Sequence, residues 1–498
     1  MILRSSRVVL PDGVRAADVH VEGGRIVRVQ EPDARLKPSR YEETKPDARL
    51  KPSRYEETQT PSRDEDDERS AKASAERLID FGHLVISPGL VDTHVHVNEP
   101  GRTEWEGFDS ATRAAAAGGV TTIVDMPLNS VPATTSVAAL EAKRAAARGR
   151  VHVDVAFWGG VVPGNAGELE ALVDAGVRGF KCFLAPSGVD EFQHVGEGDL
   201  REALPILARR HVPLLVHAED PACLGSPARL ALGDDSPGAR GCQPSGYATY
   251  LASRPTRAEL EAVRLMIRLA REFGAHVHIV HVACAEAVEA IAGAKADGVR
   301  ITAETCPHYL TFAAETIHDG ATEFKCAPPI REASHRDALW DGLQSGALDL
   351  VATDHSPAPP SMKCGGDFMT AWGGIASLEL SLAAVFTALD VERRVLPHDG
   401  PVDRSALRRI AKWMSEAPAA LANLAPRKGR IAAGHDADFV IWDPDAEWTV
   451  EPSRLQQRHK LTPYAGRRLR GAVRETWVRG ARVWVDSAPS TLSSGELL

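Results

Sequence analysis

The stretch Gly89-Leu90-Val91-Asp92-Thr93-His94-Val95-His96 closes an apolar run with two histidines two positions apart. Such a run predicts the end of a buried β-strand, and side chains at positions i and i+2 of a strand share one face. His94 and His96 could therefore bind one metal ion together. Because exposed strand histidines are also common, a metal site requires similar side chains at the ends of other strands.

From this stretch onward, apolar strand-like runs alternate with segments of helical spacing. Eight strand candidates follow one another: Leu90–Val97, Thr121–Pro127, Val151–Gly160, Gly179–Leu184, Val212–Glu219, His276–Val282, Ile301–Leu310 and Leu348–Pro357. Helix candidates lie between them: Phe108–Ala117, Ser136–Ala147, Leu200–His211, Arg257–Phe273 and Ala285–Ala294. Nearly continuous apolar strands that alternate with helices predict an α/β fold, a closed parallel (β/α)8 TIM barrel. We expect the barrel over residues 84–428, which exceeds the about 250 residues of a minimal barrel and leaves room for active-site loops.

The two ends of the chain have a different pattern. Val8–Val29 carries short alternating runs separated by turn residues, which is typical of hairpins. Gly429–Trp442 and Ala472–Val485 repeat this pattern near the C-terminus. We therefore expect residues 1–83 and 429–498 to pair into one small β-sandwich-like domain beside the barrel.

One segment fits neither domain. Pro32–Thr44 recurs identically as Pro46–Thr58 and is followed by a run of charged residues. Two short copies are too few for a stacked repeat architecture. Proline, charge and few large apolar residues predict an exposed, disordered insertion over about residues 31–75.

Composition excludes several classes of partner. The formal net charge of −10 offers no basic surface for nucleic acid or an anionic membrane. No apolar run approaches the about 20 residues of a membrane span, and the N-terminus does not resemble a signal peptide. The seven cysteines contain no C-x-x-C motif, which argues against a disulfide framework and a thiolate metal site. These features favour a cytoplasmic protein.

In a (β/α)8 barrel, the chemistry takes place at the C-terminal ends of the strands. Five of the predicted strands carry ligand-type or ionisable side chains at or near these ends: His94 and His96, Lys181, His217, His281 and Asp354. Each one alone has an ordinary structural explanation, such as a hydrogen-bonded core histidine or an aspartate that caps a turn. Their occurrence on five strands of one barrel favours a metal site.

Lys181 indicates which kind of metal site this is. It lies among apolar residues, and a buried lysine needs a partner or a role. A neutral lysine that adds carbon dioxide becomes a carbamate, which can bridge two divalent ions. We therefore expect one ion to be held by His94, His96 and Asp354, a second by His217 and His281, and both by Lys181. Zinc suits these ligands best, with manganese, iron and cobalt as alternatives.

Six motifs resemble those of a known family: Asp92–Phe108, Asp125–Ser130, Glu304–Tyr309, Ala327–Arg331, Asp354–Pro357 and Ala371–Ile375. The chain resembles the cyclic amidohydrolases of the urease-related amidohydrolase superfamily over nearly its whole length, apart from the insertion. Among these enzymes it most resembles the allantoinases. The resemblance implies two metal ions, an N6-carboxylated Lys181, a homotetramer, and the opening of the hydantoin ring of allantoin to allantoate in purine breakdown. Asp354 would then also be catalytic, accepting a proton from the attacking water and passing it to the departing nitrogen.

Other members of the superfamily are alternatives. Dihydroorotases have a pattern similar to His-x-His-x-Arg, in which the arginine grips the substrate carboxylate, whereas this chain has Asn98 at that position. Asn98 and Asn129 are instead candidate substrate-binding residues, because amide groups match the donors and acceptors of a ureido group. Hydantoinases and dihydropyrimidinases differ from this chain in the segment corresponding to Pro100–Phe108.

Two further classes stay open. His217-Ala218-Glu219 resembles a histidine–glutamate pairing of mononuclear deaminases, although their sites need no lysine such as Lys181. Some relatives are non-catalytic scaffold proteins that keep the fold but lose metal ligands. All six ligand positions are filled here, which favours an enzyme.

Overall fold

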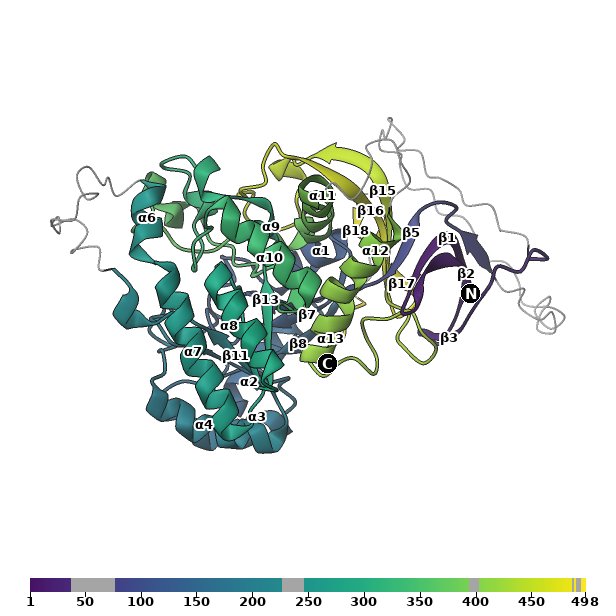
Figure 1. The fold of residues 1–498 in the computed structure, drawn as a ribbon. Coiled ribbons are helices and arrows are strands. Elements are labelled where there is room, and N and C mark those ends of the chain that lie inside the picture. Colours follow the sequence, from purple (N-terminus) through teal and green to yellow (C-terminus); the bar gives the residue numbers. More distant parts are fainter. Residues whose placement is uncertain (37–76, 226–245, 394–402, 486–487, 490–493) are drawn as a thin grey trace, which may run out of the picture.

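A ring of parallel strands forms the centre of the computed structural model, which describes residues 1–36, 77–225, 246–393, 403–485, 488–489 and 494–498 (Figure 1). The strands are β6 (Leu90–Val95), β7 (Val120–Asp125), β8 (Asp154–Phe157), β9 (Gly159–Gly160), β10 (Phe180–Phe183), β11 (Leu214–His217), β12 (Val277–Ile279), β13 (Ile301–Thr305) and β14 (Leu350–Val351). Their hydrogen-bonded order follows the chain from β6 to β8 and from β9 to β14. The structure thus confirms eight strand positions of a barrel, with β8 and β9 as two pieces of one position.

Two junctions complete the ring. Trp158 separates β8 from β9, and its backbone N donates to Asp125 O at 3.0 Å. The last and first strands meet where His96 N donates to His355 O at 2.8 Å and His355 N donates to His94 O at 3.2 Å. Closure therefore involves the histidines of the opening stretch, which places them directly beside the segment that follows β14.

Helices cover the outside of the ring, and Figure 1 shows α4, α7, α8 and α10 along one side of it. The α-helices of the described residues are α1 (Phe108–Ala117), α2 (Val137–Ala147), α3 (Leu169–Asp174), α4 (Glu197–Arg210), α6 (Tyr247–Ser253), α7 (Thr256–Phe273), α8 (Ala285–Ala296), α9 (Pro307–Thr311), α10 (Ala333–Ser345), α11 (Ser381–Arg393), α12 (Arg404–Ala411) and α13 (Ala417–Leu421). Residues at the helix ends explain where several of these helices begin or end. Ser136 caps α2 by accepting from Ala139 N, and α7 ends at Gly274 in the left-handed conformation.

All eight predicted strands extend beyond the strands of the structure, and two of them show why. The run Ile301–Leu310 is strand only to Thr305, because Pro307 begins α9, and proline suits the first position of a helix. The run Val151–Gly160 becomes strand only at Asp154. In both cases the apolar character continues beyond the strand because the flanking residues are buried as well.

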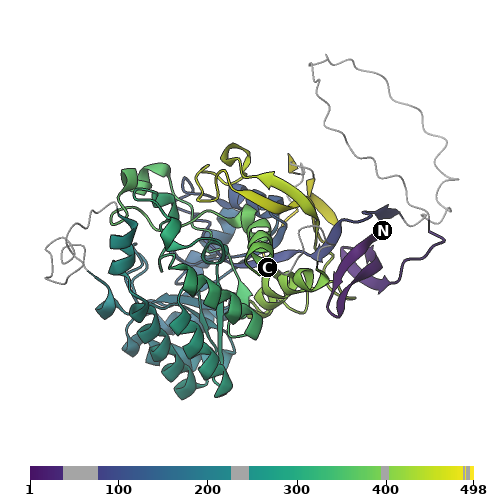
Figure 2. The ribbon, with the colours of Figure 1, turned by 45° about the horizontal axis from the view of Figure 1, so that its top comes forward.

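The chain termini pair into one nine-stranded sheet, as predicted. Its strands are β1 (Ile2–Leu10), β2 (Gly13–Glu22), β3 (Arg25–Gln30), β4 (Leu78–Asp80), β5 (Val85–Pro88), β15 (Phe439–Thr449), β16 (Arg468–Val478), β17 (Ala481–Val485) and β18 (Ala488–Pro489). β5 joins the halves, since it pairs with β1 on one side and with β15 on the other. Figures 1 and 2 place the purple N-terminal strands and the yellow C-terminal strands beside the barrel. The domain boundaries 1–83, 84–428 and 429–498 stay a prediction.

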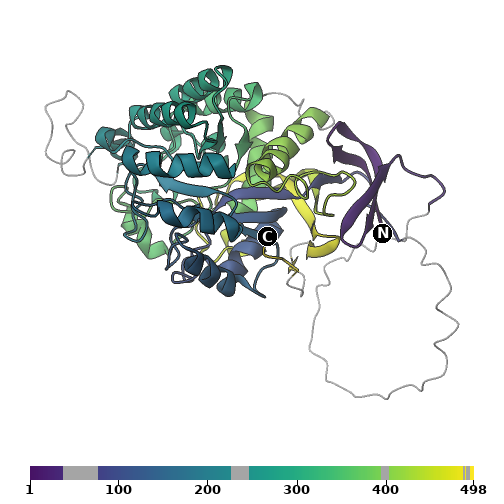
Figure 3. The same cartoon turned by 90° about the horizontal axis from the view of Figure 1, so that it is seen from below.

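The last described residues return to the barrel. Val155 N in β8 donates to Glu496 O at 2.8 Å, and Leu498 N donates to Val155 O at 2.9 Å. Figure 3 marks the C-terminus beside the barrel strands. This contact is not predicted by the sequence pattern, which places residues 429–498 entirely in the small domain.

The repeat-containing insertion and membrane-spanning helices were also considered in the sequence. Both copies of the repeat at 32–44 and 46–58 lie almost wholly outside the described residues, so the disordered insertion stays a prediction. Among the helices in the described part of the chain, none has the length and apolarity that a membrane crossing requires.

Candidate active site

All six predicted metal-site residues lie at one end of the barrel. His94 is in β6 with His96 just beyond it, Lys181 is in β10, and His217 ends β11. His281 follows β12 and Asp354 follows β14. Every one of these side chains is buried. The parallel strands therefore bring together residues that the sequence spreads over 260 positions, and they form two neighbouring clusters.

The first cluster is His94, His96 and Asp354. Asp354 Oδ1 lies 3.1 Å from His94 Nε2 and 3.3 Å from His96 Nε2. One ligand atom from each residue lies within 4.8 Å of the others, which is close enough to surround one ion. Burial acts to raise the pKa of the Asp354 carboxyl, but the neighbouring imidazoles hold that pKa well below its usual range. The cluster thus offers two imidazoles and a carboxylate.

The second cluster is His217 and His281, with Lys181 next to them. His217 Nδ1 lies 3.0 Å from His281 Nε2, and the rings of His94 and His281 are 5.5 Å apart. Lys181 Nζ has no hydrogen-bond partner among the described residues and lies 5.0 Å from the ring of Phe183. Burial lowers the pKa of Lys181 to about 8, against the opposing effect of Asp354. An amine with this pKa is partly neutral near pH 7.

Buried carboxylates orient two of the histidines. His94 Nδ1 lies 2.5 Å from Glu304 Oε1, and His217 Nε2 lies 2.8 Å from Glu219 Oε2. A ring nitrogen whose proton goes to a carboxylate leaves the other nitrogen as a ligand, so these contacts select the atoms that face each cluster. Burial acts to raise the pKa of the Glu304 carboxyl, but His94 and His278 bring it to about 2.

Neither Glu304 nor Glu219 was predicted from the sequence as the partner that orients a ligand histidine. Both residues occur in motifs that drew attention for other reasons, Glu304 at the start of Glu304–Tyr309 and Glu219 two positions after a ligand histidine. A ligand histidine commonly has a carboxylate partner, and this rule could have prompted a search for nearby acids. It could not have selected Glu304 for His94, because these two residues are 210 positions apart.

Four site residues have an uncommon backbone conformation. His281 and Asp354 have φ of 42° and 47°, and Asn98 and Asn129 both have φ of 66°. Non-glycine residues in this left-handed region are uncommon and gather at functional sites. At His281 and Asp354 this conformation occurs two and three residues after a strand ends, so the chain turns where it presents a ligand side chain.

A cavity of about 410 Å³ opens over the two clusters. His94, His96, His217, His281 and Asp354 are among its lining residues, and its volume is that of a small-molecule site. Further lining residues include apolar and cationic groups: Leu128, Phe183, Tyr250, Arg254, Lys325 and Trp372.

The two candidate substrate-binding amides differ in position. Asn129 lines the cavity, and its Nδ2 lies 3.5 Å from His96 Nδ1. Asn98 is not among the lining residues, and its Nδ2 donates to Pro357 O at 3.4 Å. The side-chain oxygens of both asparagines lack a partner within the described parts of the chain. Asn129 is therefore better placed to contact a molecule in the cavity.

Comparison with known proteins identifies the family. The model of the Amidohydrolase family matches residues 85–483, which include the whole barrel and part of the terminal sheet. The chain belongs to the amidohydrolase family. Membership confirms the resemblance found in the sequence. Together with the two clusters of ligand-type side chains, it suggests a binuclear metal site in this amidohydrolase.

This amidohydrolase is similar in sequence to allantoinases and in structure to hydantoinases and dihydropyrimidinases. An allantoinase of Streptomyces avermitilis is 46% identical over 486 residues, which cover 98% of this chain and 96% of that protein. An allantoinase of Arabidopsis thaliana is 39% identical over 510 residues, or 99% and 90% of the two chains. Among solved structures, an L-hydantoinase (dihydropyrimidinase) from Arthrobacter aurescens superposes with a TM-score of 0.82 at 29% identity, covering 100% and 99% of the chains. A dihydropyrimidinase from Brevibacillus agri has a TM-score of 0.80 at 26% identity, covering 100% and 98%.

Proposed function

We propose that this amidohydrolase hydrolyses the ring amide of allantoin and releases allantoate. The observation that carries hydrolysis is the convergence of His94, His96, His217, His281, Lys181 and Asp354 beneath a cavity of about 410 Å³. The choice of allantoin as substrate is supported by the relatives named allantoinase, which match nearly the whole chain.

The donor set fits two divalent ions. The strongest indication is the Nζ of Lys181, which has no hydrogen-bond partner in the described parts of the chain, because a buried amine without a partner is costly unless another group occupies its surroundings. We assign His94, His96 and Asp354 to one ion, His217 and His281 to the other, and Lys181 to both as a carbamate formed with carbon dioxide. Imidazole and carboxylate ligands favour zinc. Bound ions would polarise the substrate carbonyl and lower the pKa of a water molecule.

The residues of the chain prepare and move the proton. Asp354 enters the reaction ionised because its neighbouring imidazoles hold its pKa low. Its carboxylate can accept a proton from the attacking water and return it to the departing ring nitrogen. Glu304 and Glu219 hold His94 and His217 in fixed tautomers. The amide of Asn129 offers a donor and an acceptor to the ureido group.

A substrate panel tests the proposal. We expect kcat/KM on one zinc-loaded preparation, grown with bicarbonate, to be highest for allantoin among allantoin, hydantoin, dihydrouracil and dihydroorotate. Arg102, four positions after Asn98, is the candidate to replace the missing carboxylate clamp of dihydroorotases. It is ion-paired with Glu191 and donates to Asn129 O at 2.9 Å, so its guanidinium is already engaged. A higher efficiency with any of the other three compounds contradicts the proposal.

Hydantoin or dihydropyrimidine hydrolysis is the second candidate. It is favoured by the solved structures, whose similarity to this chain extends over its full length. The same panel separates it from the first candidate, because hydantoin and dihydrouracil lack the ureido group of allantoin.

We also propose a cytoplasmic homotetramer. Light scattering on the purified protein tests the oligomeric state.

A further inference from the structure

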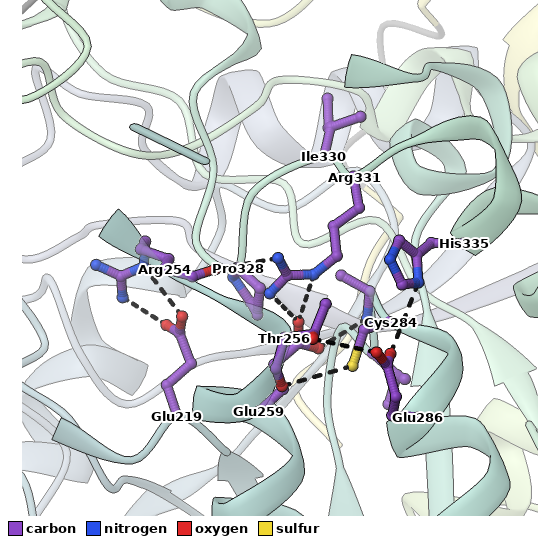
Figure 4. Close-up of polar contacts among 12 residues, drawn as sticks. Glu219, Arg254, Thr256, Glu259, Cys284, Glu286, Pro328, Ile330, Arg331 and His335 are labelled. Atoms are coloured by element: carbon purple, nitrogen blue, oxygen red, sulfur yellow. Dashed lines mark hydrogen bonds and ion pairs between the residues drawn. The ribbon is translucent and has the colours of Figure 1, made fainter. Parts of the chain in front are cut away.

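The geometry points to Arg331 as a positioning residue for the histidines of the second metal position, His217 and His281. This inference rests on the proposed binuclear site. Arg331 touches neither histidine. It belongs to a chain of four charged side chains, Glu219, Arg254, Arg331 and Glu259, in which the two arginines are neighbours (Figure 4). All of them are buried except Arg254, whose side chain is 21% exposed.

One end of this four-charge chain holds His217. Arg254 Nε donates to Glu219 Oε1 at 3.0 Å, and Arg254 Nη2 donates to Glu219 Oε2 at 2.5 Å. The same Oε2 lies 2.8 Å from His217 Nε2. A bidentate guanidinium–carboxylate contact fixes the plane of the carboxylate, and the carboxylate then fixes the orientation of the imidazole ring.

The other end holds the backbone that follows His281. Glu259 lies on the buried face of α7, and its Oε2 accepts from Ala283 N at 3.0 Å. Its other oxygen, Oε1, accepts from Arg331 Nε at 2.9 Å and from Arg331 Nη2 at 2.5 Å. Ala283 is two residues beyond His281, whose own backbone is left-handed. The position of Glu259 therefore helps to set where the turn presents the imidazole.

Arg331 joins the two ends. Its third nitrogen, Nη1, donates to Arg254 O at 3.0 Å. One planar guanidinium thus contacts Glu259 through two nitrogens and the backbone of Arg254 through the third, an arrangement that a lysine cannot reproduce. The side chains of Arg331 and Glu259 are 2% and 4% exposed, so solvent does not compete for these contacts.

The first metal position has separate supports. His94 depends on Glu304, which His278 also contacts at 3.0 Å, and the backbone N of His94 donates to Asp92 at 3.0 Å. Within the described part of the chain, Arg331 has no hydrogen bond or ion pair with His94, His96, Asp354, Glu304 or Asp92. Loss of Arg331 should therefore weaken one metal position and leave the other unchanged.

The test is metal binding to Arg331→Gln at controlled free zinc, with folding checked by circular dichroism. We expect the wild-type chain to bind two ions, and Arg331→Gln to bind one with unchanged affinity and the other about 10–100-fold more weakly, the range found for outer-shell partners of metal ligands. Arg331→Lys keeps the charge without the fork and should bind the weaker ion with intermediate affinity.

Two controls separate positioning from general destabilisation. Lys428 is as buried as Arg331 and pairs with Asp154 at 2.5 Å and Asp438 at 2.7 Å, far along the chain from the ligand histidines. Lys428→Gln should lower stability and still bind two ions with wild-type affinities. In a His217→Ala background, where the second position is already damaged, Arg331→Gln should cause no further loss of metal.

If Arg331→Gln does not fold, Glu259→Gln carries the same expectation, because its amide oxygen still accepts from Ala283 N. Unchanged affinities for both ions, or equal weakening of both, would overturn the inference. A wild-type chain that binds fewer than two ions would overturn the binuclear proposal with it. Full metal loading without allantoin hydrolysis would overturn only the substrate assignment.

Discussion

At the scale of single residues, Lys181 carries an amine in a barrel strand whose neighbours Phe180, Cys182 and Phe183 are buried apolar side chains. Nothing in the described structure accepts a hydrogen bond from its Nζ. Burial of an unpaired amine is unfavourable, so its retention at this position indicates a group that the amine binds or becomes part of. A carbamate shared by two ions satisfies this requirement.

Replacing Lys181 should therefore remove metal as well as activity. We expect Lys181→Ala to fold, to lose most bound metal and to lose most activity, because the two ions would lack their shared anion. Short carboxylic acids added to the variant should restore part of both by filling the vacated space. Elemental analysis and allantoin turnover measure the outcome, and wild-type metal content in Lys181→Ala would rule out the bridging role.

Carbamate formation should depend on pH in a defined direction. Only the neutral amine reacts with carbon dioxide, and a folded-state pKa of about 8 means that the neutral form of Lys181 increases up to this pH and predominates above it. Reactivation of metal-stripped enzyme by bicarbonate and zinc should therefore be slow at pH 6 and faster at pH 8 to 9, at a constant concentration of dissolved carbon dioxide. A reactivation rate that falls over this range contradicts the proposed chemistry.

At the scale of secondary-structure elements, the sequence predicted the eight barrel strands because each one is apolar on both faces and separated by helical spacing. It also predicted the six candidate ligands, since strand ends are where such a barrel carries its chemistry. The start of α9 at Pro307 and the break at Trp158 were missed because burial makes these flanking residues as apolar as a strand. Partners such as Glu304 and Glu259 depend on tertiary contacts between distant segments, which local patterns do not encode.

The contact between the last described residues and β8 was also missed, and it supports a prediction. Gly495 N donates to Val151 O at 3.1 Å, and Glu496 N donates to Asp154 Oδ1 at 2.9 Å. Removing residues 494–498 would remove these two hydrogen bonds and the two that join Val155 to Glu496 and Leu498 beside a buried strand. We expect a melting temperature lower by several degrees, because each intramolecular hydrogen bond contributes about 0.5–1.5 kcal/mol. An unchanged melting temperature would mean that these contacts contribute nothing.

At the scale of the whole molecule, a buried cluster of charges connects the barrel to the terminal sheet. Lys428 Nζ lies 2.5 Å from Asp154 in β8, 2.7 Å from Asp438 and 3.1 Å from Asp436. Arg479, between β16 and β17, also pairs with Asp154. These cations neutralise three acids that would otherwise repel one another between the two parts of the protein.

Replacing Lys428 should lower the free energy of unfolding and leave the substrate specificity unchanged. Lys428→Ala leaves three buried carboxylates short of a partner, and removing one member of a buried ion pair costs about 3–5 kcal/mol. We expect urea unfolding at a lower midpoint, with the order of kcat/KM values in the substrate panel unchanged. A changed order would mean that this cluster influences the active site.

The position of β5 has a consequence for the chain while it is being made. Val85–Pro88 finds one neighbour, β1, among residues synthesised just before it, but Pro88 pairs with Phe439, which emerges only after the whole barrel. Until then, one edge of a short, fully buried strand has no backbone partner, and such edges invite pairing with other chains. Since nascent chains lengthen by about 5–20 residues per second, this interval lasts tens of seconds. The half-made protein therefore exposes a strand edge of the kind that chaperones protect, because the terminal sheet is completed only after the whole barrel has been synthesised.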